Sequence, residues 1–330
     1  MKDFEYAQPR TETEVINLLS SEPGKTEVLA GGTDLIGLMK KMVVTPDRVV
    51  NISEVDSMSR IEEGTAGHLW IGSCVHLDDI LSDVKTDHYP AIKQVIQGIS
   101  SIQLQSQGTI GGEILRRPDC WYFRDGHGLL ANNGRMVVDG DNRFHAILGN
   151  RGAAKFVNPS RLAPALISLG ANVRIAGPST DAERIVPLET IYRIPNSDRE
   201  RENVLSPKEI VTHIILPPTG KHLSAAYEVR HGQGPDQPLA TAAATVDVVG
   251  GLVKQAKIVI GQVAPIPWIS AEASRAIIGK RITEKTAEIA GVEALSSAMP
   301  LSQNEYKIQL AQVAVKRAIL HAAGIETGGI

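Results

Sequence analysis

The segment 28–36, Val-Leu-Ala-Gly-Gly-Thr-Asp-Leu-Ile, holds the residues whose types and spacing are best suited to binding a phosphate. Its apolar start predicts a short strand, and the apolar spacing after it predicts a helix. Gly31 and Gly32 at the junction allow backbone conformations closed to other residues and let a ligand approach the main chain closely. Thr33 and Asp34 would begin the helix, where free N–H groups and the positive end of the dipole favour an anion.

A second stretch, 107–113, Gln-Gly-Thr-Ile-Gly-Gly-Glu, repeats this chemistry without repeating the sequence. Two glycine turns, each with a hydroxyl residue, could hold the two phosphates of one dinucleotide. Either turn alone is more often plain turn geometry than a ligand site. Neither is a Rossmann G-x-G-x-x-G or a Walker loop, so the usual nucleotide-binding folds are not indicated.

The composition is that of an ordinary soluble globular protein, with 330 residues, 42% hydrophobic residues and a net charge of −3. No basic run with interleaved aromatics indicates nucleic acid, and no apolar run is long enough for a membrane span. The first residues show no export signal. Cys74 and Cys120 make neither a disulfide framework nor a metal-ligand cluster, which favours a reducing, cytoplasmic location.

Strand and helix signals alternate in small units up to about residue 100, beginning with a helix whose capping box starts at Thr11. Segment 181–203 is polar and predicts a surface excursion, and an apolar run at 210–216 predicts a strand. After the double proline at 217–218 three strands are expected at 225–229, 240–249 and 253–263. Helices follow at 283–298 and from Ser302, whose Glu305 completes a capping box. Strands followed by helices indicate an α+β unit.

Four stretches, taken in order, resemble the FAD-binding medium subunits of molybdenum hydroxylases. This group includes xanthine dehydrogenase, carbon monoxide dehydrogenase, aldehyde oxidoreductase and 4-hydroxybenzoyl-CoA reductase. Segments 30–35 and 108–112 are similar to the family's two FAD loops. Segment 159–166, Pro-Ser-Arg-Leu-Ala-Pro-Ala-Leu, and segment 258–268, which contains Gly-Gln-Val-Ala-Pro-Ile-Pro, resemble two further family motifs. The match spans nearly the whole chain.

The resemblance implies an α+β fold with a two-part FAD-binding domain of the vanillyl-alcohol-oxidase type at 1–218. A small α/β C-terminal domain at 222–330 would hold a three-stranded antiparallel sheet plus helices. The implied cofactor is FAD, and the implied partners are a small [2Fe–2S] ferredoxin-like subunit and a large molybdopterin-binding subunit. The chain would supply no catalytic residue and no metal ligand of its own. The implied cofactor-binding residues are Leu29, Ala30, Gly31, Gly32, Thr33, Asp34, Leu35, Gly108, Thr109, Ile110, Gly111, Gly112, Glu113, Arg161 and Leu162.

Three residues depart from the family pattern near the expected flavin site. Arg161 stands where the family usually has an Asp, so an acceptor becomes a fixed cation that could stabilise an anionic reduced flavin or simply face solvent. Glu113 replaces an Asn, which places negative charge near the phosphates unless its side chain points away. Glu228 occupies a position where relatives often carry Lys.

Segment 114–156 resembles an insertion that carries a four-cysteine [4Fe–4S] cluster in some family branches. Only Cys120 of the four cysteines is present, and a cubane cluster needs four such ligands, so we expect no cluster here. The aromatic run Trp121, Tyr122 and Phe123 could stack on a flavin but more often anchors a loop to its own core. Cys120 itself is expected to be a buried small hydrophobe.

Three hypotheses follow from these residues. The first is an FAD-binding subunit that moves electrons between iron–sulfur clusters of a partner and an external acceptor. The second is a degenerate structural or assembly subunit of the same complex with weak or no flavin binding, which the three departures and the missing cysteines would favour. The third is a self-sufficient flavin oxidase, for which the C-terminal part shows no clear substrate cap or base.

Overall fold

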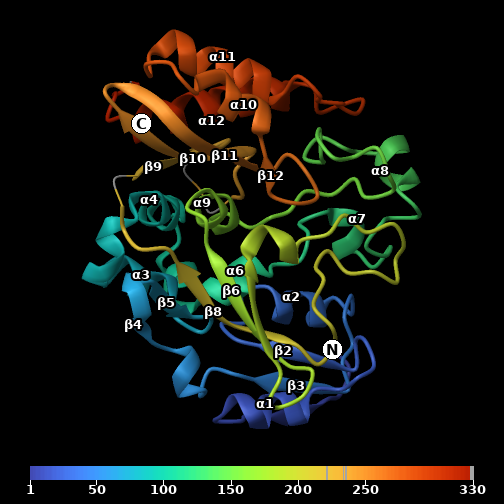
Figure 1. The fold of residues 1–330 in the computed structure, drawn as a ribbon. Coiled ribbons are helices and arrows are strands. Elements are labelled where there is room, and N and C mark those ends of the chain that lie inside the picture. The colour runs from blue at the N-terminus through green and yellow to red at the C-terminus, as the bar shows by residue number, and fades with distance from the viewer. Residues whose placement is uncertain (221, 233, 235, 328–330) are drawn as a thin grey trace.

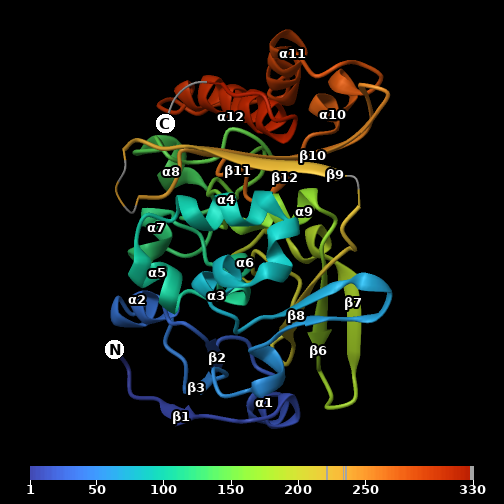
Figure 2. The same ribbon diagram turned by 90° about the vertical axis from the view of Figure 1, so that its left-hand side faces the viewer.

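The computed structural model of the chain describes residues 1–220, 222–232, 234 and 236–327. These residues form three sheets, and Figures 1 and 2 show the N-terminal sheet at one end of the molecule and the C-terminal sheet with its helices at the other. No helix in the described ranges is both long and apolar enough to cross a bilayer. The same ranges contain no group of three or more His, Cys, Asp or Glu side chains arranged to hold a metal ion.

The N-terminal sheet is parallel, with strand order β1-β3-β2. Thr11 caps the first helix, since its side chain accepts a hydrogen bond from the N–H of Glu14 at 3.2 Å. The predicted capping box is incomplete, because the side chain of Glu14 accepts from the N–H of Arg10 and not from that of Thr11. The predicted strand and helix around the first glycine turn are also present. The elements of this part are β1 (Glu5–Ala7), α1 (Glu12–Leu18), β2 (Thr26–Leu29), α2 (Leu35–Lys40) and β3 (Arg48–Asn51).

The middle sheet is antiparallel, with strand order β4-β5-β8-β6-β7. The predicted strand at 210–216 is its central strand β8, which is buried on both faces. The polar segment 181–203 is more than a surface excursion, because it contains β7, which pairs with β6. The strands are β4 (Ile61–Glu63), β5 (Leu69–Gly72), β6 (Asn172–Ala176), β7 (Glu183–Pro187) and β8 (Ile210–Leu216).

The largest apolar cluster joins the middle sheet, helices of this part of the chain and the inner face of the C-terminal sheet, and its residues run from Leu69 to Val259. Burial of these side chains is the main stabilising term for this part of the chain. The helices are α3 (Leu77–Ser82), α4 (Pro90–Gly98), α5 (Ile102–Gln107), α6 (Ile110–Ile114) and α9 (Leu162–Ser168), with 3₁₀ turns at η1 (Asp56–Met58), η2 (Thr65–Gly67), η3 (Val84–His88) and η4 (Leu188–Ile191).

The C-terminal sheet has four antiparallel strands, in the order β12-β11-β10-β9, and the expectation of three is wrong. The missed strand contributes two pairs, Trp268 with Ile260 and Ile269 with Val259, and so short a strand has no readable alternation in the sequence. Figure 1 shows the C-terminal helices on the outer face of this sheet and α4 and α9 on the inner face. The strands are β9 (His222–Val229), β10 (Ala240–Val249), β11 (Leu252–Gly261) and β12 (Trp268–Ile269).

The three outer helices are α10 (Ala271–Ile277), α11 (Glu284–Ala294) and α12 (Tyr306–Ala322), and α10 was not predicted. The predicted capping box from Ser302 to Glu305 is wrong. Helix α12 begins at Tyr306, and Glu305 makes no side-chain cap. The chain before it is turned by Asn304, whose side chain accepts from the N–H of Leu301 at 2.6 Å. A local side-chain contact therefore replaces the expected cap.

Segment 114–156 folds as a long loop with two short helices, α7 (Trp121–Arg124) and α8 (Arg135–Asp139). It has an apolar cluster of its own, which includes Cys120, Phe123 and Phe156 and packs on Leu38 of α2. The loop is therefore fixed against the helix that follows the first glycine turn.

Candidate functional site

The first glycine turn, between β2 and α2, comes into direct contact with the second. A Cβ atom on Gly31 would lie 1.7 Å from the carbonyl oxygen of Gln107, so only glycine fits there. Gly32 has a φ of +71°, a left-handed conformation that is costly for other residues. The two turns predicted from the sequence thus meet at one place in the fold.

The second turn is rigidly held by its own hydrogen bonds. Thr109 caps α6 by accepting from the N–H of Gly112 at 3.1 Å. The N–H groups of Ile110 and Gly111 donate to the carbonyls of Val75, at 3.0 Å, and Ser73, at 2.9 Å. A Cβ on Gly111 would lie 2.6 Å from that of Ser73. This turn is therefore packed tightly, and most of its N–H groups already have acceptors.

The first turn has the opposite character. The backbone N–H groups of residues 31–34 donate to no main-chain carbonyl within the described part of the chain. Buried or half-buried N–H groups without acceptors are rare in folded proteins and are costly unless a ligand or water satisfies them. The first turn therefore presents a row of donors at the start of α2, where the helix dipole also favours an anion.

The residues that carry these donors line a cavity of about 320 Å³ between the N-terminal sheet and β8. This volume lies within the range of small-molecule sites, roughly 300–1,000 Å³. The predicted site residues that line it are Ala30, Gly31, Gly32, Thr33, Asp34, Leu35, Thr109, Gly111 and Gly112. The predicted residues that do not line it are Leu29, Gly108, Ile110, Glu113, Arg161 and Leu162.

Sequence reasoning missed a large share of the cavity wall. Ser73 and most residues of the segment 203–211 line it, and five arginines do so as well, namely Arg116, Arg117, Arg193, Arg199 and Arg201. The signal available in the sequence was that the polar segment 181–203 contains three of these arginines in a stretch of nine residues, 193–201. Its polarity instead suggested a solvated loop, because nothing local indicates which other segment a polar loop faces.

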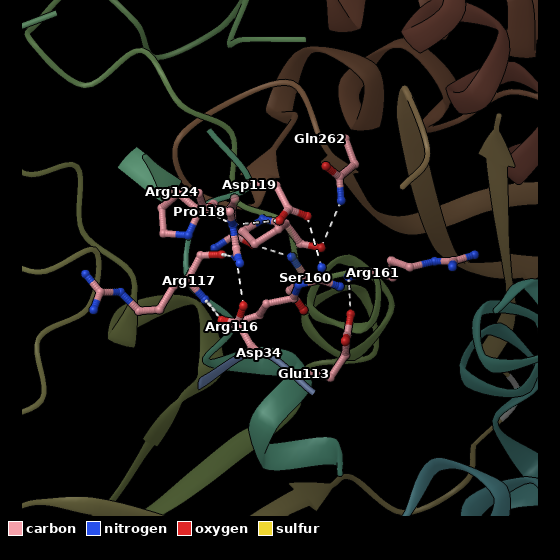
Figure 3. A network of polar contacts seen from close by, with 12 residues as sticks. Asp34, Glu113, Arg116, Arg117, Pro118, Asp119, Arg124, Ser160, Arg161 and Gln262 are labelled. Carbon is pink, nitrogen blue, oxygen red and sulfur yellow. Dashed lines mark hydrogen bonds and ion pairs between the residues drawn. The ribbon is translucent and has the colours of Figure 1, made fainter. Parts of the chain in front are cut away.

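Asp34 links the first glycine turn to the 114–156 loop (Figure 3). Its carboxylate accepts from the main-chain N–H of Arg117 at 2.9 Å and pairs with the guanidinium of Arg124 at 2.8 Å. Arg124 also contacts Asp119 at 3.0 Å and the carbonyl of Pro118 at 2.9 Å. The carboxylate at the start of α2 is therefore neutralised by a neighbouring cation rather than left beside the donors.

The three departures from the family pattern contact one another. The side chain of Arg161 is 4% exposed, and its Nε donates to the carboxylate of Glu228, of which 9% is exposed, at 2.8 Å. The main-chain N–H of Arg161 donates to Glu113 at 2.8 Å (Figure 3). Burial raises the pKa of the Glu113 carboxyl, and the charges of Arg116 and Arg161 partly offset that rise. Arg161 therefore does not face solvent, and Glu113 points to it rather than into the cavity.

The aromatic residues of the 114–156 loop pack on one another. The ring of Trp121 lies edge-on to those of Phe144 and His145, with centroids 5.6 and 5.4 Å apart, and Phe123 is buried. These contacts favour the interpretation that the aromatics anchor the loop. Burial, reinforced by the charge of Lys307, lowers the pKa of His145 to about 4, and burial raises the pKa of the Cys120 thiol 3.2 Å away. Both are therefore neutral near pH 7, and Cys120 is buried as expected.

Comparisons with known proteins match the chain over nearly its whole length. Residues 2–219 match the FAD binding domain in molybdopterin dehydrogenase, and residues 225–322 match the CO dehydrogenase flavoprotein C-terminal domain. The aldehyde oxidoreductase FAD-binding subunit PaoB of Escherichia coli is 29% identical, covering 94% of this chain and 96% of its own length. The carbon monoxide dehydrogenase medium chain of Afipia carboxidovorans is 26% identical, with 97% and 96% coverage.

Two solved structures show the same fold. Quinoline 2-oxidoreductase from Pseudomonas putida 86 has a TM-score of 0.76 at 22% identity, covering 98% of this chain and 99% of its own. Carbon monoxide dehydrogenase from Hydrogenophaga pseudoflava has a TM-score of 0.75 at 23% identity, covering 97% of both chains. The chain belongs to the family of FAD-binding domains of molybdopterin dehydrogenases. More narrowly, it is a medium subunit of the carbon monoxide dehydrogenase and aldehyde oxidoreductase type, and so a component of an oxidoreductase.

The buried Arg161–Glu228 pair generates a first prediction. Arg161→Asp or Glu228→Lys alone should lower the free energy of unfolding by about 3–5 kcal/mol, because each leaves two like charges buried together. The double variant should recover at least half of this loss, since it restores opposite charges. Urea denaturation of all three proteins measures it. As a control, Arg275→Ala removes an exposed ion pair with Glu272 and should cost under about 1 kcal/mol. A double variant as unstable as the two losses added together would contradict the pairing.

His145 generates a second prediction. Its pKa in the folded chain, about 4, lies below the unfolded value of about 6.5, so the folded state binds fewer protons between these limits. Stability is therefore lost as the pH falls below about 6.5, and the loss continues down to about pH 4. Between about pH 7 and about pH 5 this residue should account for about 2 kcal/mol of that loss. Urea denaturation of His145→Gln at both pH values should show a correspondingly smaller pH dependence, and an unchanged dependence would contradict the assignment.

Proposed function

We propose that this chain binds FAD in the cavity and moves electrons within a molybdopterin-dependent hydroxylase complex. The electrons would pass between iron–sulfur clusters of a small [2Fe–2S] ferredoxin-like subunit and an external acceptor, and a large molybdopterin-binding subunit would complete the complex. The observation that carries this proposal is the row of N–H donors, without a main-chain acceptor in the described chain, on residues 31–34 that line the cavity. A diphosphate is the kind of group that satisfies such donors.

The residues present fit this cofactor. The N–H groups of residues 31–34 would bind the phosphates, with the hydroxyl of Thr33 beside them. The second turn would form a close-packed wall against which the nucleotide lies, because Gly111 and Gly112 leave no side chain in the way. When bound, the flavin supplies the redox chemistry, while the chain orients it and excludes water.

The alternative of a degenerate structural subunit rested on the missing cysteines and on Arg161, Glu113 and Glu228. In the fold the side chain of Arg161 pairs with Glu228, its main-chain N–H donates to Glu113, and none of these three residues lines the cavity. They therefore place no unpaired charge against a bound phosphate. This arrangement supports flavin binding over the degenerate alternative.

The relatives support the rest of the proposal. The matched proteins are named as an FAD-binding subunit and as medium chains, which fits a division into an FAD-binding domain at 1–218 and a C-terminal domain at 222–330. Cys74 and Cys120 are free and lie in different apolar clusters, so we propose a complex in which this chain holds no [4Fe–4S] cluster. Buried free thiols also fit a cytoplasmic location.

The proposal is tested by a visible absorption spectrum with metal analysis. The protein is purified with its native partners, and again alone after incubation with FAD. Stoichiometric flavin, with no iron assignable to this chain, is expected. Absence of flavin from both preparations would support the structural-subunit alternative. Iron retained by the isolated chain would show that residues 114–156 hold a cluster after all.

The first glycine turn generates a third prediction, on flavin retention. Gly32→Val should abolish it, because a β-branched residue is strained at a φ of +71° and its Cβ would lie 3.3 Å from Ile36. Gly111→Val should act in the same way through its contact with Ser73. The control is Gly37→Ala in α2, where a Cβ meets nothing within 4 Å. Flavin per chain is read from the visible absorbance, and full occupancy in Gly32→Val would overturn the phosphate-turn assignment.

A further inference from the structure

The carboxylates that line the cavity are all neutralised by arginines outside or across it. Glu209 also accepts from the N–H of Ser206 at 2.8 Å, so its charge is held by the protein. None of these carboxylates is therefore left to repel an anion. The ion pairs are Glu27 with Arg201, Asp34 with Arg124, and Glu209 with Arg184.

The arginines that line the cavity are paired in the same way, with one exception. Arg199 has no carboxylate within 4.0 Å among the residues that the structure describes, and it is exposed. Among the described residues, Arg199 is therefore the cavity-lining cation whose charge no carboxylate balances. The paired arginines are Arg116 with Asp119, Arg117 with Glu202, Arg193 with Glu200 and Arg201 with Glu27.

The loop that carries Arg199 is held in place from both sides. The N–H of Arg193 donates to the carbonyl of Glu202 at 3.0 Å, which closes the base of the loop. Asp198 accepts from the N–H of Leu130 at 2.7 Å, and Glu200 accepts from the N–H of Asn196 at 2.6 Å. The residues on either side of Arg199 therefore have fixed contacts. The guanidinium of Arg199 itself makes no ion pair with the described residues.

We propose that Arg199 is a direct ligand of the diphosphate of the bound flavin dinucleotide. The inference rests on the proposed function, because it names a contact within the same cavity. The N–H groups of residues 31–34 would hold the diphosphate from one segment of the wall, and the guanidinium of Arg199 would reach it from another.

Arginine suits this role because its planar fork can donate two parallel hydrogen bonds to phosphate oxygens, whereas lysine is a point charge. A hydrogen bond to a charged group contributes about 1.5 kcal/mol or more, which corresponds to an affinity change of roughly tenfold. Because Arg199 is exposed, salt should screen much of this attraction.

The test measures binding of FAD to the full chain from the change in flavin fluorescence, at low and at high salt. The variants are Arg199→Ala, Arg199→Lys and the control Arg281→Ala. Arg281 is also exposed and without an ion pair among the described residues, but it lies outside the cavity. Binding of ADP and of adenosine, measured by calorimetry, locates the contact on the phosphates.

Arg199→Ala should weaken FAD about tenfold at low salt and less at high salt, with an unchanged melting temperature. Arg199→Lys should recover part of the affinity, and Arg281→Ala should bind as the wild type does. ADP should weaken together with FAD, and adenosine should not. Unchanged FAD affinity in Arg199→Ala, or a loss shared equally by adenosine, would overturn this inference and leave the proposed function intact. If the wild-type chain binds no FAD at all, the proposed function fails and this inference fails with it.

Discussion

The cavity depends on one close approach of main chain to main chain. The carbonyl of Gln107 occupies the space where a side chain on Gly31 would begin, so the turn after β2 and the turn before α6 can touch. Because glycines form the contact, no side chain separates the two turns, and this part of the wall offers the N–H groups of residues 31–34 rather than side chains.

A backbone wall that favours anions imposes a condition on the charges around it. Asp34 begins α2, and a free carboxylate there would oppose a phosphate held by the same N–H groups. Its contacts with Arg124 and the main chain of Arg117 remove that conflict. The long 114–156 loop, which packs on Leu38 of α2 through its own apolar cluster, therefore also supplies the cation and the donor that neutralise Asp34.

Much of the fold was predictable because it depends on local patterns. Apolar alternation predicted the strands at 210–216 and 240–249, and the turn residues Gly31 and Gly32 were identified from the sequence. What could not be predicted depends on contacts between distant segments. The strand β12 has only two residues, and the arginines of the 193–201 segment become cavity residues only through the folding of β6 to β8 around them. Most of the wall could therefore not be predicted from the spacing of residues in the sequence.

The three departures from the family pattern also could not be judged from the sequence, because their effect depends on contacts between distant segments. Judged singly, each puts the wrong charge near a flavin site, yet a buried ion pair depends on opposite signs and geometry, not on which position carries which sign. Arg161 and Glu228 together add no net charge. The charge of Arg161 also favours the ionised form of the buried Glu113 carboxyl, which accepts a hydrogen bond from the main-chain N–H of Arg161. An Asp at 161 would instead place two carboxylates side by side in a region with little water. Glu113, Arg161 and Glu228 are therefore best understood as one mutually dependent set, in which each substitution is tolerable because the other two are present.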